Sequence, residues 1–272
     1  MAKKKIGIYG NLESTANHKV EDLYIIVDNQ SIHFVVKHLV SNNYVAFESF
    51  VSSSDLNGFS QLLAYLQNNS KLMHAVYQNV HFVMNNSRVL ISKSQAIKDH
   101  TIYQNELNML FGNQSDHELL VTPLQEDKVV VFSVPDIYQT LLTRAFPTGK
   151  WSHYLIALVQ NATEDGVYIY FFDGYYIGLI RDKNIVQFVK YFEESEDAQN
   201  VYNILNACKH GQIDPNNAAL YLIGYHPENN HWVIELGTYF KDAIIEQASQ
   251  NGVVKSLQQE YPQHHFATYF IF

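Results

Sequence analysis

The sequence is poor in cysteine and in long apolar runs. Its 272 residues contain a single cysteine, Cys208, which excludes an internal disulfide. Cys208 lies near the end of an expected helix, where the dipole raises a thiol pKa, so we expect a packed structural thiol rather than a nucleophile. No window approaches the roughly 20 apolar residues of a transmembrane helix, and the basic start MAKKK precedes no apolar signal run. We therefore expect a cytoplasmic protein without membrane insertion.

Positive charge is also scarce. The chain has 18 Lys and Arg against 27 Asp and Glu, which gives a net charge of −9 and a pI near 5.8. A chain of this charge repels phosphate backbones and anionic lipid surfaces on average. The composition therefore predicts no nucleic-acid partner.

Spacings typical of metal or catalytic sites are missing as well. Among thirteen histidines, His226 and His231 are separated by a turn, and the adjacent His264 and His265 would point to opposite faces of a strand. No Ser-His-Asp set, carboxylate pair or Cys-His pair stands out by spacing. The sequence thus predicts no metal site and assigns no catalytic residue.

The most informative stretch is a strand meander followed by a helix. Three runs rich in aromatic and β-branched residues, 167–173, 175–181 and 185–192, are separated by turn residues. Ser195 then offers an N-cap, and acidic residues suit the first turn of a helix over 196–210. This pattern predicts a βββα unit.

The same pattern occurs earlier in the chain. Residues 23–51 contain three similar runs, and Asp55 precedes a helical segment. If Asp28 is placed on Asp173, the first two runs match at an offset of about 145, and after a short gap Phe47 falls on Phe188. A chance match of apolar patterns is the alternative, since short hairpins are common. A duplication predicts two lobes, 1–130 and 131–272.

The remaining segments complete an α/β pattern. Residues 1–21 are expected to form an irregular arm, and 151–159 fit a strand or a helix equally well. Further strands are expected within 75–85, 88–94, 117–124, 128–135 and 219–225, a terminal strand over 264–272, and helices over 95–111, 136–146, from Asn229 or Asn230, and over 241–259.

Short motifs in this order resemble those of a known group of proteins. They are Val134-Pro135 at a strand end, Phe146-Pro147 at a helix end, His153, and Glu196-Asp197 at a helix start. The chain resembles an uncharacterised bacterial domain-of-unknown-function family with the actin-like ATPase fold of actin, heat-shock 70 chaperones and sugar kinases. The resemblance implies a two-lobed, ribonuclease H-like fold with mixed sheets in duplicated βββα-containing lobes.

The resemblance also implies a place for a nucleotide. Catalytic members have glycine-rich hairpins that admit phosphate, and an Asp in each lobe that holds Mg²⁺ through water. Here both aspartates are present, but the hairpins have few glycines and the adenosine-side loop keeps one. The candidate nucleotide-binding residues are Asp28, Ser31, Asp173, Gly174, Tyr175, Tyr176, Gly224, Tyr225 and His226.

Two functions remain open from these residues, and the resemblance alone adds a third, a pilus-type adaptor that binds a membrane partner's peptide in its groove. One is a non-catalytic binding or scaffold module with a degenerate nucleotide site, no cofactor and a protein partner, because Asp also serves as an ordinary turn residue. The other is a divergent ATPase or phosphotransferase that uses Asp28 and Asp173 for Mg²⁺ and Ser31 near phosphate. A ligand or partner segment would bind in a cleft lined by Tyr175, Tyr176, Tyr225 and His226. Partner identity and oligomeric state stay open.

Overall fold

The chain forms two compact units, which divide after Ala157 inside helix α4 (Tyr154–Asn161). The computed structural model describes residues 2–10, 20–28, 30–52, 56–94, 100–125, 127–224, 226, 230–246 and 265–272. The sequence placed the border between residues 130 and 131. Most of β8 (Lys128–Pro135), together with α3 (Asp136–Ala145) and β9 (Lys150–His153), lies beyond that point but belongs to the first unit.

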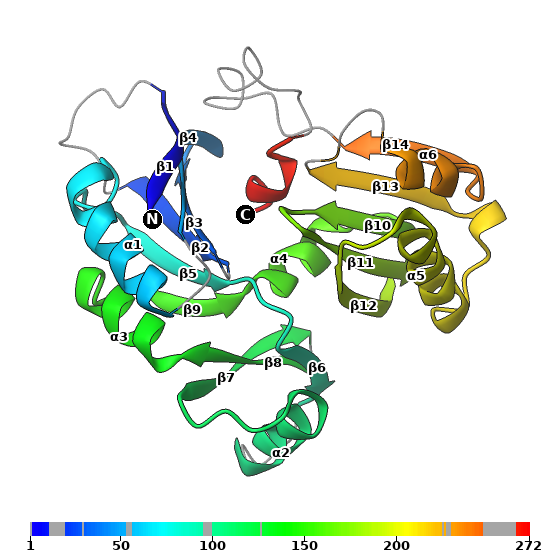
Figure 1. The fold of residues 1–272 in the computed structure, drawn as a ribbon, viewed down its shortest axis with the longest axis horizontal. Coiled ribbons are helices and arrows are strands. Elements are labelled where there is room, and N and C mark those ends of the chain that lie inside the picture. Colours follow the sequence, from blue (N-terminus) through cyan, green and yellow to red (C-terminus); the bar gives the residue numbers. More distant parts are fainter. Residues whose placement is uncertain are drawn as a thin grey trace. The chain divides into compact units, whose positions relative to one another are not determined.

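The first unit is built on a six-stranded sheet of order β1-β4-β3-β2-β5-β9 (Figure 1). Besides β9, its strands are β1 (Lys3–Tyr9), β2 (Glu21–Val27), β3 (Ser31–His38), β4 (Asn43–Val51) and β5 (Asn79–Met84), and helix α1 (Leu56–Asn69) follows β4. Leu62 and Leu66 of α1 and Leu142 of α3 are buried, because apolar positions at helical spacing lie on one face of each helix.

Strand β1 replaces part of the irregular arm expected at the N-terminus. Its residues pair antiparallel with β4, from Lys3 opposite Val51 to Tyr9 opposite Ala46. A run of three lysines followed by a glycine-containing segment has weak strand propensity. Its strand conformation therefore depends on hydrogen bonds to β4, which lies more than thirty residues away in sequence.

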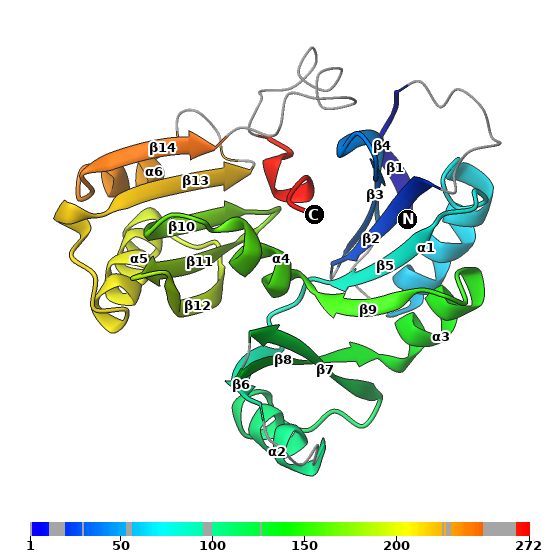
Figure 2. The ribbon, with the colours of Figure 1, turned by 180° about the vertical axis from the view of Figure 1, so that it is seen from behind.

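A small layer is inserted between β5 and α3 (Figure 2). Strands β6 (Val89–Lys93), β7 (His117–Gln125) and β8 form a sheet of order β6-β8-β7, and α2 (His100–Phe111) packs on it through Tyr103. The guanidinium of Arg88 donates to the carbonyl oxygens of Phe111 and Gly112 at 2.9 and 2.7 Å. These bonds satisfy carbonyls that the end of a helix leaves without partners.

The second unit has a five-stranded sheet of order β12-β11-β10-β13-β14. Its strands are β10 (Gly166–Phe171), β11 (Tyr175–Asp182), β12 (Ile185–Glu193), β13 (Ala219–Gly224) and β14 (Asp242–Glu246), and its helices are α5 (Asp197–His210) and α6 (His231–Gly237). Both helices lie on one face of the sheet (Figure 1), where Ile204, Trp232 and Leu236 pack against Ile169 and its neighbours. The side chain of Asn230 caps α6, as expected.

Two expectations for the C-terminal part were wrong, and one ambiguity is settled. Residues 242–246, expected as the start of a helix, form β14, which pairs in parallel with β13; residues 247–259 lie outside the described part. Ala267–Tyr269 form a single 3-10 turn instead of a terminal strand. The segment 151–159 contains the end of β9 and then the start of α4.

The two units share one topology, which supports the duplication over a chance match. The order β4-β3-β2-β5-β9 in the first unit corresponds strand by strand to β12-β11-β10-β13-β14 in the second. In each unit one helix follows the three-stranded meander and another precedes the last strand, and β1 is an additional strand in the first unit. Each also has a register shift at the same place of its second hairpin, after Val36 in β3 and after Ile180 in β11. Shared irregularities of this kind do not follow from apolar alternation alone.

The register corrects the sequence alignment by one residue. Val27 lies opposite Ile32, and Phe171 lies opposite Tyr176, so the first hairpin matches at an offset of 144 (171 − 27), not 145. Asp28 therefore corresponds to Phe172, and Asp173 corresponds to Asn29. In the same way Phe47, opposite Val35, corresponds to Val189, opposite Leu179. In a strand, a shift of one residue moves a side chain to the other face.

Candidate functional site

The first hairpin holds Asp28 and Ser31 at the end of β2 and the start of β3. The backbone N–H of Asp28 donates to the carbonyl oxygen of Ser31 at 2.9 Å, which closes the turn. The Asp28 side chain is buried, and its charge adds to the effect of burial in raising the pKa of Tyr138. The hydroxyl of Ser31 lies 2.8 Å from Nε2 of buried His33. Ser31 is thus engaged with the sheet.

The second hairpin presents an aromatic ring where the first presents a carboxylate. The N–H of Phe172 donates to the carbonyl oxygen of Tyr175 at 3.0 Å, as in the first hairpin. The Phe172 side chain is buried and its ring stacks on that of Tyr175, with centroids 4.8 Å apart. Asp173 and Gly174 are exposed at the tip of the turn, and Gly174 has a φ of 81°.

Tyr175 and Tyr176 lie on opposite faces of the second sheet. Tyr176 is a core residue, 1% exposed, with its ring 5.1 Å from Trp232. Its hydroxyl accepts from Nδ2 of Asn203 at 3.2 Å, and burial raises its pKa to about 12. Tyr175 contacts Tyr191 on the other face. The two rings therefore do not line one common surface.

The loop after β13 is packed against the end of the chain. Gly224 has a φ of 95°, and a Cβ there would lie 2.6 Å from Cγ2 of Thr268. Tyr269, in the same turn as Thr268, meets the ring of Phe172 edge-on at 6.3 Å. Nδ1 of the buried His226 donates to the Gly224 carbonyl oxygen at 3.2 Å, while Tyr225 lies outside the described residues. The C-terminal turn of the chain thus covers the ends of β10 and β13.

Buried ionisable groups elsewhere have structural partners. Nδ1 of His153 accepts from the N–H of Leu155 at 3.1 Å, and its Nε2 donates to the carbonyl oxygen of Asn86 at 3.1 Å. Burial lowers its pKa to about 3, so the imidazole is neutral. Cys208 is buried as expected, and burial raises its pKa to about 12. Among the residues with described positions, no three His, Cys, Asp or Glu side chains are grouped to hold a metal ion.

A buried carboxylate joins β1 to β4. Glu48 is fully buried, and its Oε1 lies 2.6 Å from Nζ of Lys4 in β1. The hydroxyls of Tyr9 and Ser70 donate to the same carboxylate. Gly7 lies opposite Glu48 in the register, where a Cβ would come within 2.6 Å of the Lys4 ammonium. The added strand is therefore fixed by an ion pair as well as by its backbone.

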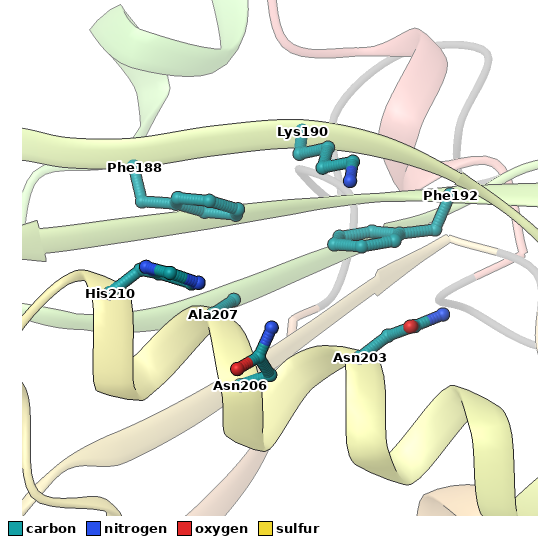
Figure 3. Close-up of a pocket in the computed structure, with 7 residues that line it drawn as sticks. All are labelled: Phe188, Lys190, Phe192, Asn203, Asn206, Ala207 and His210. Atoms are coloured by element: carbon teal, nitrogen blue, oxygen red, sulfur yellow. The ribbon is translucent and has the colours of Figure 1, made fainter.

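A pocket of about 330 Å³ lies between β12 and α5 in the second unit. Figure 3 shows side chains of β12 directed toward the helix and polar side chains of α5 facing them. The lining residues are Phe188, Lys190, Phe192, Asn203, Asn206, Ala207 and His210. None of them was predicted from the sequence as a site residue. The sequence feature that could have pointed to this pocket is that Lys190 stands in the second repeat where Glu48 stands in the first. That correspondence is visible only after the alignment is corrected by one residue.

Solved structures place this architecture. A Bacteroides thetaiotaomicron protein described as having an actin-like ATPase fold and unknown function matches with a TM-score of 0.76 at 12% identity, over 86% of this chain and 94% of that chain. The ethanolamine utilization protein EutJ from Carboxydothermus hydrogenoformans matches with a TM-score of 0.50 at 7% identity, over 97% and 90%. The cytoplasmic domain of EpsL, an inner membrane component of the type II secretion system of Vibrio cholerae, gives 0.49 at 13% identity, over 91% and 97%. The chain has the actin-like ATPase fold.

Sequence comparison assigns the family. Residues 11–243 match the family described as "Protein of unknown function (DUF3822)", and because this is more than half of the chain, the chain belongs to that family. No curated protein matches the sequence. Within the described part of the chain, no helix has the length and apolar character needed to cross a membrane.

Proposed function

We propose that this protein is a non-catalytic actin-like protein that acts as a binding or scaffold module and needs no nucleotide. The observation that carries the proposal is Phe172, which occupies the position that Asp28 has in the first repeat. A phenyl ring offers no oxygen to the water shell of Mg²⁺. Since catalytic relatives of this fold use one carboxylate in each lobe, the loss of one supports a non-catalytic role.

The packing around Gly224 supports the same proposal. In relatives that bind nucleotide, glycines after this strand give the ligand access to the backbone. Here the open side of Gly224 is filled by Thr268, and Tyr269 contacts Phe172. The chain's own residues therefore take the space next to the glycine.

A divergent Mg-dependent ATP-binding or ATP-hydrolysing enzyme is the second candidate. The observations that favour it are the buried Asp28 and the exposed Gly174, around which a Cβ would meet no atom within 4 Å. An exposed glycine leaves backbone N–H groups accessible to phosphate. This candidate requires Asp173 to act from the tip of the turn.

Thermal melting with millimolar Mg-ATP or Mg-ADP separates the two candidates. We expect no change in Tm with either nucleotide. A ligand at 100 times its Kd would stabilise the native state by about 2.7 kcal/mol, which is several degrees for a chain of this size. A shift of that size that disappears in Asp28→Ala or Asp173→Ala would overturn the proposal in favour of the enzyme.

A further inference from the structure

The two repeats differ in what covers the third strand of their meander. In the first unit, β4 is bonded on one side to β3 and on the other to β1. In the second unit, the corresponding strand β12 pairs with β11 and, among the residues with described positions, has no strand on its other side. An open edge strand is a template for pairing with another extended segment.

The register shows which backbone groups of β12 face outward. The N–H of Glu194 donates to the carbonyl oxygen of Gly174 at 3.0 Å, which makes these two residues a hydrogen-bonded pair. Because such pairs alternate along an antiparallel ladder, the N–H and C=O groups of Val189 and Glu193 point away from β11. Val189 corresponds to Phe47 of β4. The carbonyl oxygen of Val45 accepts from the N–H of Gly10, so the backbone groups of Phe47, two residues further along, also point toward β1.

The side chains next to this edge are also matched, but with reversed charge. Glu48 lies opposite Phe34, and Lys190 lies opposite Gly178, which are corresponding positions. In the first unit, the Lys4 ammonium of the added strand lies 2.6 Å from Glu48 and 5.3 Å above the Phe50 ring. A strand added to β12 would meet Lys190 where β1 meets Glu48.

The pocket beside β12 has the chemistry to receive a carboxylate. Nζ of Lys190 lies 5.3 Å above the ring of Phe192, the counterpart of Phe50. Amide and imidazole groups of Asn203, Asn206 and His210 face these residues from α5 (Figure 3). Lysine and amide N–H groups are the usual donors to a carboxylate. Since a cation lines the pocket here, its ligand should be acidic.

We propose that the edge of β12 binds an extended segment of a partner protein, which adds as an antiparallel strand and places an Asp or Glu side chain against Lys190. The covered edge of β4 is the template for this arrangement, with the charges exchanged. The inference rests on the proposed function as a binding module and names the kind of partner that the module takes.

Two labelled peptides test the proposal. One has the sequence of residues 2–10, AKKKIGIYG, and the other has the same sequence with Lys4→Glu. In fluorescence anisotropy with the full chain, we expect the Lys4→Glu peptide to bind about tenfold more tightly, as expected for one favourable charge pair. In the variant Lys190→Glu, the order of the two affinities should be reversed.

A matched control separates local from overall charge. Lys241→Glu makes the same charge change at an exposed position that precedes β14, so both affinities should stay as in the unchanged chain. The first peptide could also replace β1 on β4 in the first unit, but its affinity for that site would not change in Lys190→Glu. The variant therefore identifies binding at β12.

Hydrogen exchange supplies the geometric readout. The amides of Val189 and Glu193 should exchange fast in the free chain and slowly with the Lys4→Glu peptide bound. Failure of that peptide to bind at millimolar concentration, or binding that leaves these two amides unprotected, would overturn the proposal. Slow exchange in the free chain together with a dimer mass would show that a second copy covers the edge, and would also overturn it. None of these outcomes changes the melting response to nucleotide, which tests the proposed function separately.

Discussion

Two buried histidines of the first unit are fixed in the neutral state. His153 has both ring nitrogens hydrogen-bonded to backbone groups, and His33 lies beside the hydroxyl of Ser31 and near the charge of Lys5. Burial is the main cause that lowers the pKa of each from 6.5 to about 3. Neither histidine is therefore a cation near neutral pH.

The state of His153 predicts how stability depends on pH. Between pH 6.5 and pH 3 the unfolded chain binds a proton at this residue and the native chain does not, so the free energy of unfolding falls as the pH is lowered. The slope is at most about 1.4 kcal/mol per pH unit for each such histidine. Urea unfolding at several pH values should show that His153→Gln has a smaller slope than the unchanged chain.

The control for this prediction is His100→Gln. His100 is exposed at the start of α2, so its replacement makes the same exchange of residue type away from the core. If His153→Gln and the unchanged chain had equal slopes between pH 4 and 6.5, His153 would be protonated in the native state, contrary to its hydrogen bonds.

At the residue scale, the sequence identified residue types better than their surroundings. Asp28, Gly174 and Gly224 lie at strand ends, as expected. The pairing of Asp28 with Asp173 failed by one position, because apolar alternation aligns two strands only to within the length of a turn. The partners opposite Ile32 and Tyr176 were needed to fix it. Tyr176 was likewise expected at a surface and is in the core.

Two glycines at strand ends of the second unit, Gly174 and Gly224, differ in their contact with the C-terminal turn. Gly224 and Gly174 both have a positive φ. A Cβ added at Gly224 would lie within 4 Å of Thr268 and of the Phe171 carbonyl, whereas a Cβ added at Gly174 would meet no atom within 4 Å. The two glycines thus share the same backbone requirement and differ in their packing. This difference makes them a matched pair for substitution.

Alanine substitution should separate the two effects. Gly174→Ala should destabilise the chain by about 1 kcal/mol, the cost of a side chain at positive φ. Gly224→Ala should cost at least about 2 kcal/mol, because its Cβ must also displace Thr268. Chemical unfolding followed by tryptophan fluorescence measures both, since Trp232 lies in the same core. Equal losses would mean that neither Thr268 nor the Phe171 carbonyl packs against Gly224 in solution.

At the element scale, local pattern was sufficient where a strand has its partners close by. The three strands of each meander were predicted because their apolar residues alternate between explicit turns. Strands β1 and β14 were missed, because each is bonded at the edge of a sheet to a strand distant from it in sequence or separated by a helix. Edge pairing at long range leaves little trace in a short sequence window.

For the whole molecule, the net charge of −9 predicts that the chain does not bind nucleic acids non-specifically. Non-specific DNA binding typically requires a basic surface and reaches Kd values of roughly 10⁻⁴–10⁻⁶ M at physiological salt. We expect no retardation of a DNA or RNA duplex at micromolar protein in an electrophoretic mobility assay. Retardation that weakens as salt is added would reveal a basic patch hidden by the average charge.

The sequence by itself indicated an α/β pattern and a repeated βββα unit, and it excluded an internal disulfide. These follow from composition and from periodicities of two and 3.6 residues, which are local properties of the chain. The tertiary structure alone decided which residues correspond between the repeats. It placed Phe172 at the position of Asp28, Lys190 at that of Glu48, and the C-terminal turn against Gly224. The reason is physical: strand register and edge coverage are set by hydrogen bonds between distant segments, and one residue of slip changes the face on which every side chain lies.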